Sequence, residues 1–194
     1  GIKLSERELF NRVLQLEQEL TTGGGWQDQI GGAVGGVKLI STEPGLIPDP
    51  RIHFVPSDLV LPSTRGGQIL LYYTGIRRLA KDILRSVVGN YLDRDRVMMN
   101  TLRQLRSLPP KVVEALSQKD MRQFGALIDV AWRLNKQIDP GSTTDLIDEI
   151  LGRAKPYMLG GKLLGAGGGG FLLIVAKSAT DAGALSTLLT DNPP

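Results

Sequence analysis

Length and composition describe an ordinary globular chain and exclude several chemistries. The 194 residues include 41% hydrophobic and 22% charged side chains, enough for one large or two small domains with a buried core. The absence of cysteine excludes disulfides, cysteine nucleophiles and thiolate metal sites. One histidine, His53, excludes a multi-histidine metal site and argues against a Ser-His-Asp triad. The longest apolar run, Phe171–Ala176, is too short to cross a membrane, and the first residues carry no apolar signal core. We therefore expect a cytoplasmic protein with no membrane partner.

The charge is nearly balanced, with a formal net charge of +3. The excess comes from residues 77–106, which carry eight positive and three negative side chains. Such a run on helices is usually a solvated face. A nucleic-acid site would interleave stacking aromatic residues, and only Tyr91 qualifies in this stretch. No nucleic-acid partner is expected.

The first part of the chain is predicted to mix helices and strands. Ser5 and Glu8 fit a capping box that begins a helix ending before the glycines at 23–25. Its expected apolar face consists of Leu9, Val13, Leu16 and Leu20. Asp28 is placed at the start of a short helix through Val34. Strands are expected at 37–41, 51–55 and 68–73, together forming a small sheet.

The second part is predicted to be mostly helical. Helical periodicity covers residues 76–91, 93–106, 109–117, 119–137 and 143–154. A strand at 171–176 follows, with few evident partners, and then a last helix that begins near Ser178 or Asp181 and ends near Leu189. The order of elements predicts an α+β fold.

Glycine is concentrated in two clusters, and these are the places to look for function. The second cluster, Gly165–Gly170, could bring backbone amides close to an anion. It runs into a strand rather than a helix, so it is neither a dinucleotide fingerprint nor a Walker loop. A glycine-rich turn that only lets two strands pack is the alternative.

The first cluster, Gly-Gly-Gly-Trp-Gln-Asp-Gln at 23–29, places a carboxylate after a flexible loop. Asp28 could cap a helix, or it could position or deprotonate a hydroxyl group near a phosphate. Gln27 and Gln29 could bind hydroxyl groups. Trp26 could stack on a sugar ring or simply pack in the interior.

Three segments together resemble the GHMP family of small-molecule kinases. They are Gly-Gly-Gly-Trp-Gln-Asp-Gln (23–29), Tyr-Thr-Gly-Ile-Arg-Arg-Leu-Ala (73–80) and Gly-Ala-Gly-Gly-Gly-Gly-Phe (165–171). The Trp-Gln-Asp-Gln form is most similar to the L-fucokinases, alone or in bifunctional fucokinase/guanylyltransferases. The resemblance implies the end of the family's N-terminal lobe at 1–75 and a ferredoxin-like C-terminal lobe with added helices at 76–194.

The resemblance also implies an activity and a set of site residues. The activity is transfer of the γ-phosphoryl group of ATP, with Mg²⁺, to the anomeric hydroxyl of a sugar such as L-fucose. Asp28 then matches the catalytic acidic residue. Substrate-binding positions are Gly24, Gly25, Trp26, Gln27, Thr74, Gly75 and Arg77. Nucleotide-side positions are Gly165, Ala166, Gly167, Gly168 and Gly169. No metal-ligating residue is assigned.

One departure from the family pattern limits these expectations. The family's second motif, Pro-x-x-x-Gly-Leu-x-Ser-Ser, cradles the nucleotide phosphates, and these 194 residues lack it. The sequence is therefore expected to be a piece of a larger kinase, inactive alone unless another chain or a homo-oligomer partner completes it. The alternatives are a heptose 7-phosphate kinase, which would use Arg77 and Arg78 for the extra phosphate, and a non-catalytic sugar- or partner-binding module.

Overall fold

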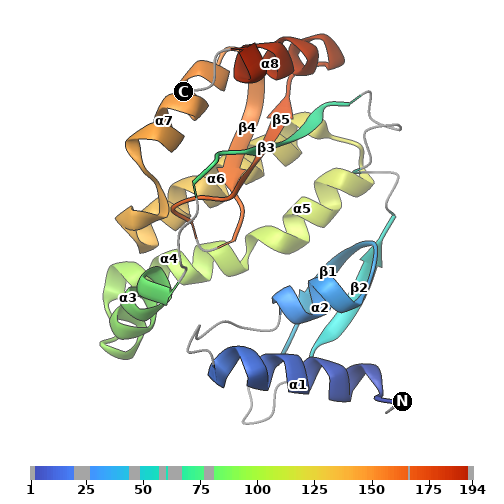
Figure 1. Ribbon diagram of the computed structural model, residues 1–194, viewed down its shortest axis with the longest axis vertical. Helices are drawn as coiled ribbons and strands as arrows, with labels where there is room; N and C mark the ends of the chain where they lie inside the picture. The colour runs from blue at the N-terminus through green and yellow to red at the C-terminus, as the bar shows by residue number, and fades with distance from the viewer. Residues whose placement is uncertain are drawn as a thin grey trace. The chain divides into compact units, whose positions relative to one another are not determined.

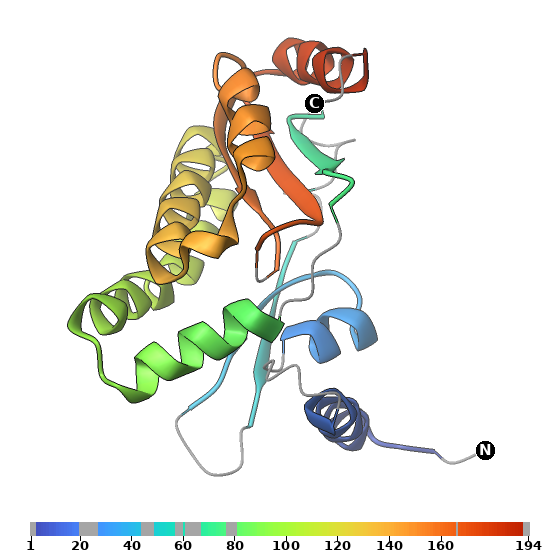
Figure 2. The same ribbon diagram turned by 60° about the vertical axis from the view of Figure 1, so that its left-hand side comes forward.

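The computed structural model describes residues 3–19, 27–43, 49–56, 60, 67–76, 81–165 and 167–191 (Figures 1 and 2). The chain forms two compact units, 1–56 and 57–194, which are described separately. The lobe boundary expected between residues 75 and 76 stays a prediction. Both units combine helices with antiparallel strands, which confirms the predicted α+β class.

The first unit begins with two helices, α1 (Glu6–Glu19) and α2 (Gln27–Ala33), that contact each other. The predicted capping box is confirmed: the Ser5 amide and hydroxyl donate to the Glu8 carboxylate at 2.8 and 2.7 Å. The predicted apolar face is wrong, since Leu9 and Leu16 are exposed whereas Phe10 is buried. Residue spacing shows that a helix has an apolar side, but the packing partner decides which side chains are buried.

Strands β1 (Val37–Ser41) and β2 (Arg51–Val55) pair antiparallel and lie where the sequence predicts them. Val37 pairs with Val55 and Ser41 with Arg51. The expectation that the third strand, β3 (Ile69–Tyr73), completes this sheet is wrong. β3 pairs with β5 in a second sheet. The partner of a strand depends on contacts between distant segments, which the local sequence does not specify.

The sheet of the second unit has the order β3-β5-β4, and both pairings are antiparallel. β4 (Met158–Leu163) was not predicted, and β5 (Phe171–Ala176) therefore has the partners that the sequence seemed to lack. Ile69 pairs with Val175 and Leu163 with Leu172. β5 is thus the central strand, and four of its six residues are buried.

Five α-helices of the second unit lie between β3 and β4, as the periodicity predicts. They are α3 (Lys81–Leu92), α4 (Arg96–Arg106), α5 (Leu108–Ser117), α6 (Met121–Ile138) and α7 (Asp145–Ala154), with the short 3-10 turn η2 (Pro140–Ser142) before α7. The carboxylates of Asp95 and Asp120 cap α4 and α6, and the Thr144 hydroxyl caps α7. The last helix is α8 (Ala179–Asp191). At its start the Ser178 hydroxyl accepts a hydrogen bond from the Asp181 amide.

Two helices end in the same left-handed turn. The Arg94 and Asp95 amides donate to the Tyr91 and Asn90 carbonyls after α3, and the same pattern follows α5 at Lys119. This is the Schellman arrangement, in which glycine usually takes the left-handed position. Arg94 and Lys119 take it here, with φ of 53° and 60°. A side chain in this conformation costs roughly 1–2 kcal/mol.

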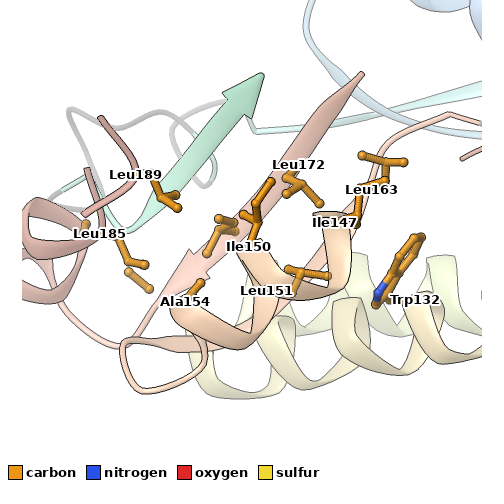
Figure 3. Packing of buried hydrophobic residues seen from close by; sticks show 12 residues of the cluster. Trp132, Ile147, Ile150, Leu151, Ala154, Leu163, Leu172, Leu185 and Leu189 are labelled. Atoms are coloured by element: carbon orange, nitrogen blue, oxygen red, sulfur yellow. The ribbon is translucent and has the colours of Figure 1, made fainter. Parts of the chain in front are cut away.

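The main core lies between the sheet and helices α7 and α8 (Figure 3). Leu172, Ile174 and Ala176 alternate along β5 and contribute one face of it. Leu163 of β4 and Trp132 of α6 also belong to this core. The helices contribute the fully or nearly fully buried side chains Ile147, Ile150, Leu151, Ala154, Ala182, Leu185 and Leu189.

Helix α6 crosses β4 at two glycines. A Cβ atom at Gly160 would stand 1.9 Å from the carbonyl oxygen of Gly125, and one at Gly125 would stand 2.5 Å from Cβ of Leu159. Both distances are far inside van der Waals contact, so the backbones touch directly. The crossing holds the strand that leads into the glycine cluster.

No helix within the described part of the chain is long and apolar enough to cross a membrane.

Candidate functional site

Asp28 lies in the first turn of α2 and is exposed. The helix begins one residue earlier, at Gln27, so Asp28 is inside the helix rather than at its cap. The next two side chains, Gln29 and Ile30, are buried. Burial of these neighbours fixes the orientation of the first turn, and the carboxylate stands at the positive end of the helix, where negative charge is stabilised.

Five of the predicted site residues lie outside the described residues: Gly24, Gly25, Trp26, Arg77 and Ala166. Asp28 and Gln27 belong to the first compact unit, whereas the other predicted positions that the structure describes belong to the second.

The second glycine cluster is the connection between β4 and β5. Gly165, Gly167, Gly168 and Gly170 have φ of 73°, 108°, 76° and 96°, in the region that favours glycine. The loop therefore needs glycine for its path, as the hairpin interpretation of the sequence requires. The anion-binding interpretation requires amide groups that converge on one point, and it stays a prediction.

Two amides of this loop are bound to other parts of the second unit. The Gly168 amide donates to the Ser142 carbonyl at 2.7 Å, and the Gly170 amide donates to the Ile76 carbonyl at 3.0 Å. The contacts are tight: a Cβ at Gly167 would stand 2.6 Å from Cα of Ser142, and one at Gly169 would stand 2.7 Å from the Ile76 oxygen. The loop is thus held on two sides, and the Gly168 amide is already used within the protein.

Thr74 and Gly75 lie directly against the glycine loop. The Thr74 amide and hydroxyl both donate to the Gly170 carbonyl at 2.9 Å, and the hydroxyl accepts the Ile76 amide at 3.3 Å. Thr74 is only 9% exposed, and Gly75 turns the chain with φ of 74°. Thr74 and Gly170 are 96 residues apart in the sequence, and their contact joins segment 74–76 to the loop.

Ser142 is a member of this assembly that the sequence did not reveal. It is 3% exposed, sits at the end of η2, and donates its hydroxyl to the Asn135 carbonyl at 3.3 Å. The Asp139-Pro140-Gly141 segment signalled a turn there, but a turn signal does not say which loop will pack on it.

The described residues do not by themselves form a metal site or a complete phosphate cradle. No group of three or more His, Asp or Glu side chains that could hold a metal ion occurs in this part of the chain. Lys162 of β4, three residues before the loop, is mostly buried, and this burial lowers the pKa of its ammonium group. These residues therefore assign no ligand to Mg²⁺ within the described part of the chain.

The fold and the two glycine-rich elements agree with one family. Residues 112–189 match the family model described as GHMP kinases C terminal. These residues therefore form a domain of the GHMP kinases C-terminal family.

Its relatives narrow the comparison. A Bacteroides fragilis protein named L-fucokinase/L-fucose-1-P guanylyltransferase is 39% identical over all 194 residues, which cover 20% of that protein. An Arabidopsis thaliana protein named bifunctional fucokinase/GDP-fucose pyrophosphorylase is 38% identical over 190 residues, 97% of this chain and 18% of that protein. The chain thus spans about a fifth of the length of these relatives.

Solved structures share the fold. The L. major mevalonate kinase in complex with R-mevalonate matches with a TM-score of 0.70 at 21% identity, over 99% of this chain and 56% of that one. The Methanococcus jannaschii mevalonate kinase matches with a TM-score of 0.64 at 18% identity, over 98% of this chain and 55% of that one.

Proposed function

We propose that this chain is the sugar-binding and C-terminal part of a kinase that phosphorylates the anomeric hydroxyl of L-fucose with ATP. The observation that carries the proposal is the identity of 38–39% along essentially the whole chain to proteins named as fucokinases. The GHMP kinase domain at 112–189 supports phosphoryl transfer as the reaction class.

Asp28 is the residue proposed to act on the attacking hydroxyl. The anomeric oxygen forms a bond to the γ-phosphorus, the bond from that phosphorus to the β,γ-bridging oxygen breaks, and ADP leaves. Asp28 orients the hydroxyl group and accepts its proton. Phosphoryl transfer depends on positioning and charge more than on covalent catalysis. A single carboxylate is therefore sufficient to act on the attacking hydroxyl group.

Gln27, together with Gly24, Gly25 and Trp26, which lie outside the described residues, is proposed to bind the sugar beside Asp28. Thr74, Gly75 and Arg77 are also proposed to bind the substrate. The glycine loop, Gly165–Gly169, is proposed to support the nucleotide side of the site. Its two anchors on Ser142 and Ile76 favour a rigid supporting role, because the Gly168 amide is already bonded within the protein.

Calorimetric titration with L-fucose tests the proposal on the 194-residue chain. Saturable binding is expected, and it should persist in Asp28→Asn, since an amide can still hydrogen-bond a hydroxyl group. Turnover of L-fucose with Mg·ATP by this chain alone is not expected, because the family's phosphate-cradling motif is absent from these residues. Absence of L-fucose binding in wild type, under conditions where the chain is folded, would overturn the sugar assignment.

Turnover is measured with this chain substituted for the matching segment of the Bacteroides fragilis relative. Asp28→Asn should lower kcat about 10²–10⁴-fold and leave the KM for L-fucose within about threefold. Asp145→Asn is a matched control, because Asp145 is also exposed in the first turn of a helix, α7. Equal activity of the Asp28 variant and the control would refute the role of Asp28. Preference for heptose 7-phosphate over L-fucose would instead identify the sibling kinase.

A further inference from the structure

Helices α3 and α4 follow each other in the chain (Figure 1). They line a pocket whose described residues have no role in the proposed kinase site. Its volume is about 760 Å³, within the range of roughly 300–1,000 Å³ that is usual for small-molecule sites. All of its described lining residues come from the end of α3, the following turn and α4: Tyr91, Leu92, Arg94, Arg96, Met99 and Arg103. The described part of the lining therefore comes from one local element of the second unit.

The pocket has a strongly positive lining. Three of its residues are arginines, and in the described part of the chain no carboxylate makes an ion pair with any of them. The nearest acidic residues in the sequence are Asp93 and Asp95, and the Asp95 carboxylate accepts the Met98 amide at 2.7 Å as the cap of α4. Three guanidinium groups without a carboxylate partner suit a ligand with more than one negative charge, because each can bind phosphate oxygens in a bidentate way.

Arg94 occupies the left-handed position of a Schellman turn, which usually holds glycine. Its left-handed conformation closes the Schellman turn after α3, where glycine would fit without strain. The turn thus holds a guanidinium group at the pocket in a conformation that the backbone does not favour. A strained residue at a concave charged surface is a reason to look for a ligand.

Three of the described lining residues are largely apolar. Tyr91 is 51% exposed and Leu92 is 70% exposed, so both present surface that the protein's own core does not cover. Met99 also lines the pocket. An exposed aromatic ring next to arginines suits a planar ring attached to phosphate groups.

We propose that the pocket between α3 and α4 binds a nucleoside diphosphate, with Arg94, Arg96 and Arg103 on the phosphates and Tyr91 against the base. The described lining residues of the pocket include neither Asp28 nor any residue of the glycine loop, and the proposal does not depend on the proposed kinase function. A small ligand fits better than a nucleic acid, because the surface is a pocket with one stacking ring rather than a groove with successive aromatic side chains.

Calorimetry with ADP and with inorganic pyrophosphate tests the proposal on the 194-residue chain. ADP is expected to bind with a stoichiometry of about one, and its affinity should fall as salt is raised. Arg94→Gly and Arg103→Gln should each weaken ADP and pyrophosphate about tenfold. Tyr91→Ala should weaken ADP and leave pyrophosphate unchanged.

Lys119→Gly is the matched control. It relieves the same left-handed strain in a Schellman turn but lies outside the residues that line the pocket. It should leave ADP binding unchanged, and thermal unfolding should show that both glycine variants are at least as stable as wild type.

Three outcomes would overturn the proposal. The first is no saturable binding of ADP or pyrophosphate to the folded wild-type chain. The second is ADP binding that Arg94→Gly and Arg103→Gln leave unchanged, which would place the ligand elsewhere. The third is a single-stranded oligonucleotide that binds more tightly than ADP and is weakened by the same variants. Equal effects of Tyr91→Ala on ADP and pyrophosphate would remove the base contact from the proposal.

Discussion

Gly160→Ala tests whether the direct contact between α6 and β4 holds the second unit together. The added Cβ would lie 1.9 Å from the Gly125 carbonyl oxygen, whereas ordinary contact begins at 3.4 Å. The helix and strand must therefore separate by roughly 1.5 Å, the difference between those two distances. The atoms that collide belong to backbone on both sides, so no side chain can rotate away.

The expected loss of stability follows from this geometry. Inserting an extra methyl group into a packed interior costs typically about 1–3 kcal/mol, and a backbone collision should be at the upper end or beyond. In a chain of this size a loss of about 3 kcal/mol lowers the melting temperature by roughly 6–12 °C. Thermal unfolding followed by circular dichroism measures that shift.

Gly152→Ala is the matched control. Gly152 lies within α7, and a Cβ there would meet nothing within 4 Å. Alanine is the better helix former by up to about 1 kcal/mol, so this variant should melt at the same temperature as wild type or higher. A Gly160→Ala protein that melts within 2 °C of the Gly152→Ala protein would refute the close-crossing argument.

Three further predictions concern hydrogen bonding and charge. Thr74→Val removes the hydroxyl that donates to Gly170 and should lower the free energy of unfolding by about 1–2 kcal/mol, measured by urea denaturation; an unchanged midpoint would contradict this. Hydrogen bonds from Ser5 lower the pKa of Glu8, so this stabilisation is present above the unfolded pKa and is lost as pH falls through the folded pKa. Ser5→Ala should therefore lower the melting temperature more at pH 7 than at pH 3. Burial lowers the pKa of Lys162, so its charge destabilises the fold below the folded pKa, and this penalty disappears as pH rises toward the unfolded pKa. Lys162→Met should raise the melting temperature at pH 7, with a smaller gain at pH 10; an equal gain at both values would exclude the charge as its cause.

The local elements of this fold could be read from the sequence because their signals are local. Apolar spacing and breaks at proline and glycine predict α3 to α7, and the strands at 37–41 and 51–55 match the structure. The capping box at Ser5 is of the same kind, since both of its residues lie within one turn.

The partners of the strands could not be read in this way. β4 contains Gly160 and Gly161, and glycine weakens the sequence signal for a strand. In the structure the absence of a side chain at Gly160 lets α6 pack directly against β4. β3 was assigned to the wrong sheet because no local feature says which distant edge it will join. The anchoring of the glycine loop on Ser142 was missed for the same reason.

The central position of β5 decides how the second unit can be shortened. The family match begins at residue 112, after β3, so a piece cut at that boundary would lose β3 and the Thr74 contact with Gly170. One side of Phe171–Ala176, an entirely apolar strand, would then present unpaired backbone groups and could join the same strand of another molecule. Such a piece should precipitate or form oligomers, whereas one that keeps residues 67–76 retains a covered edge. Boundaries for producing this unit should therefore follow the strand order and not the limits of sequence similarity.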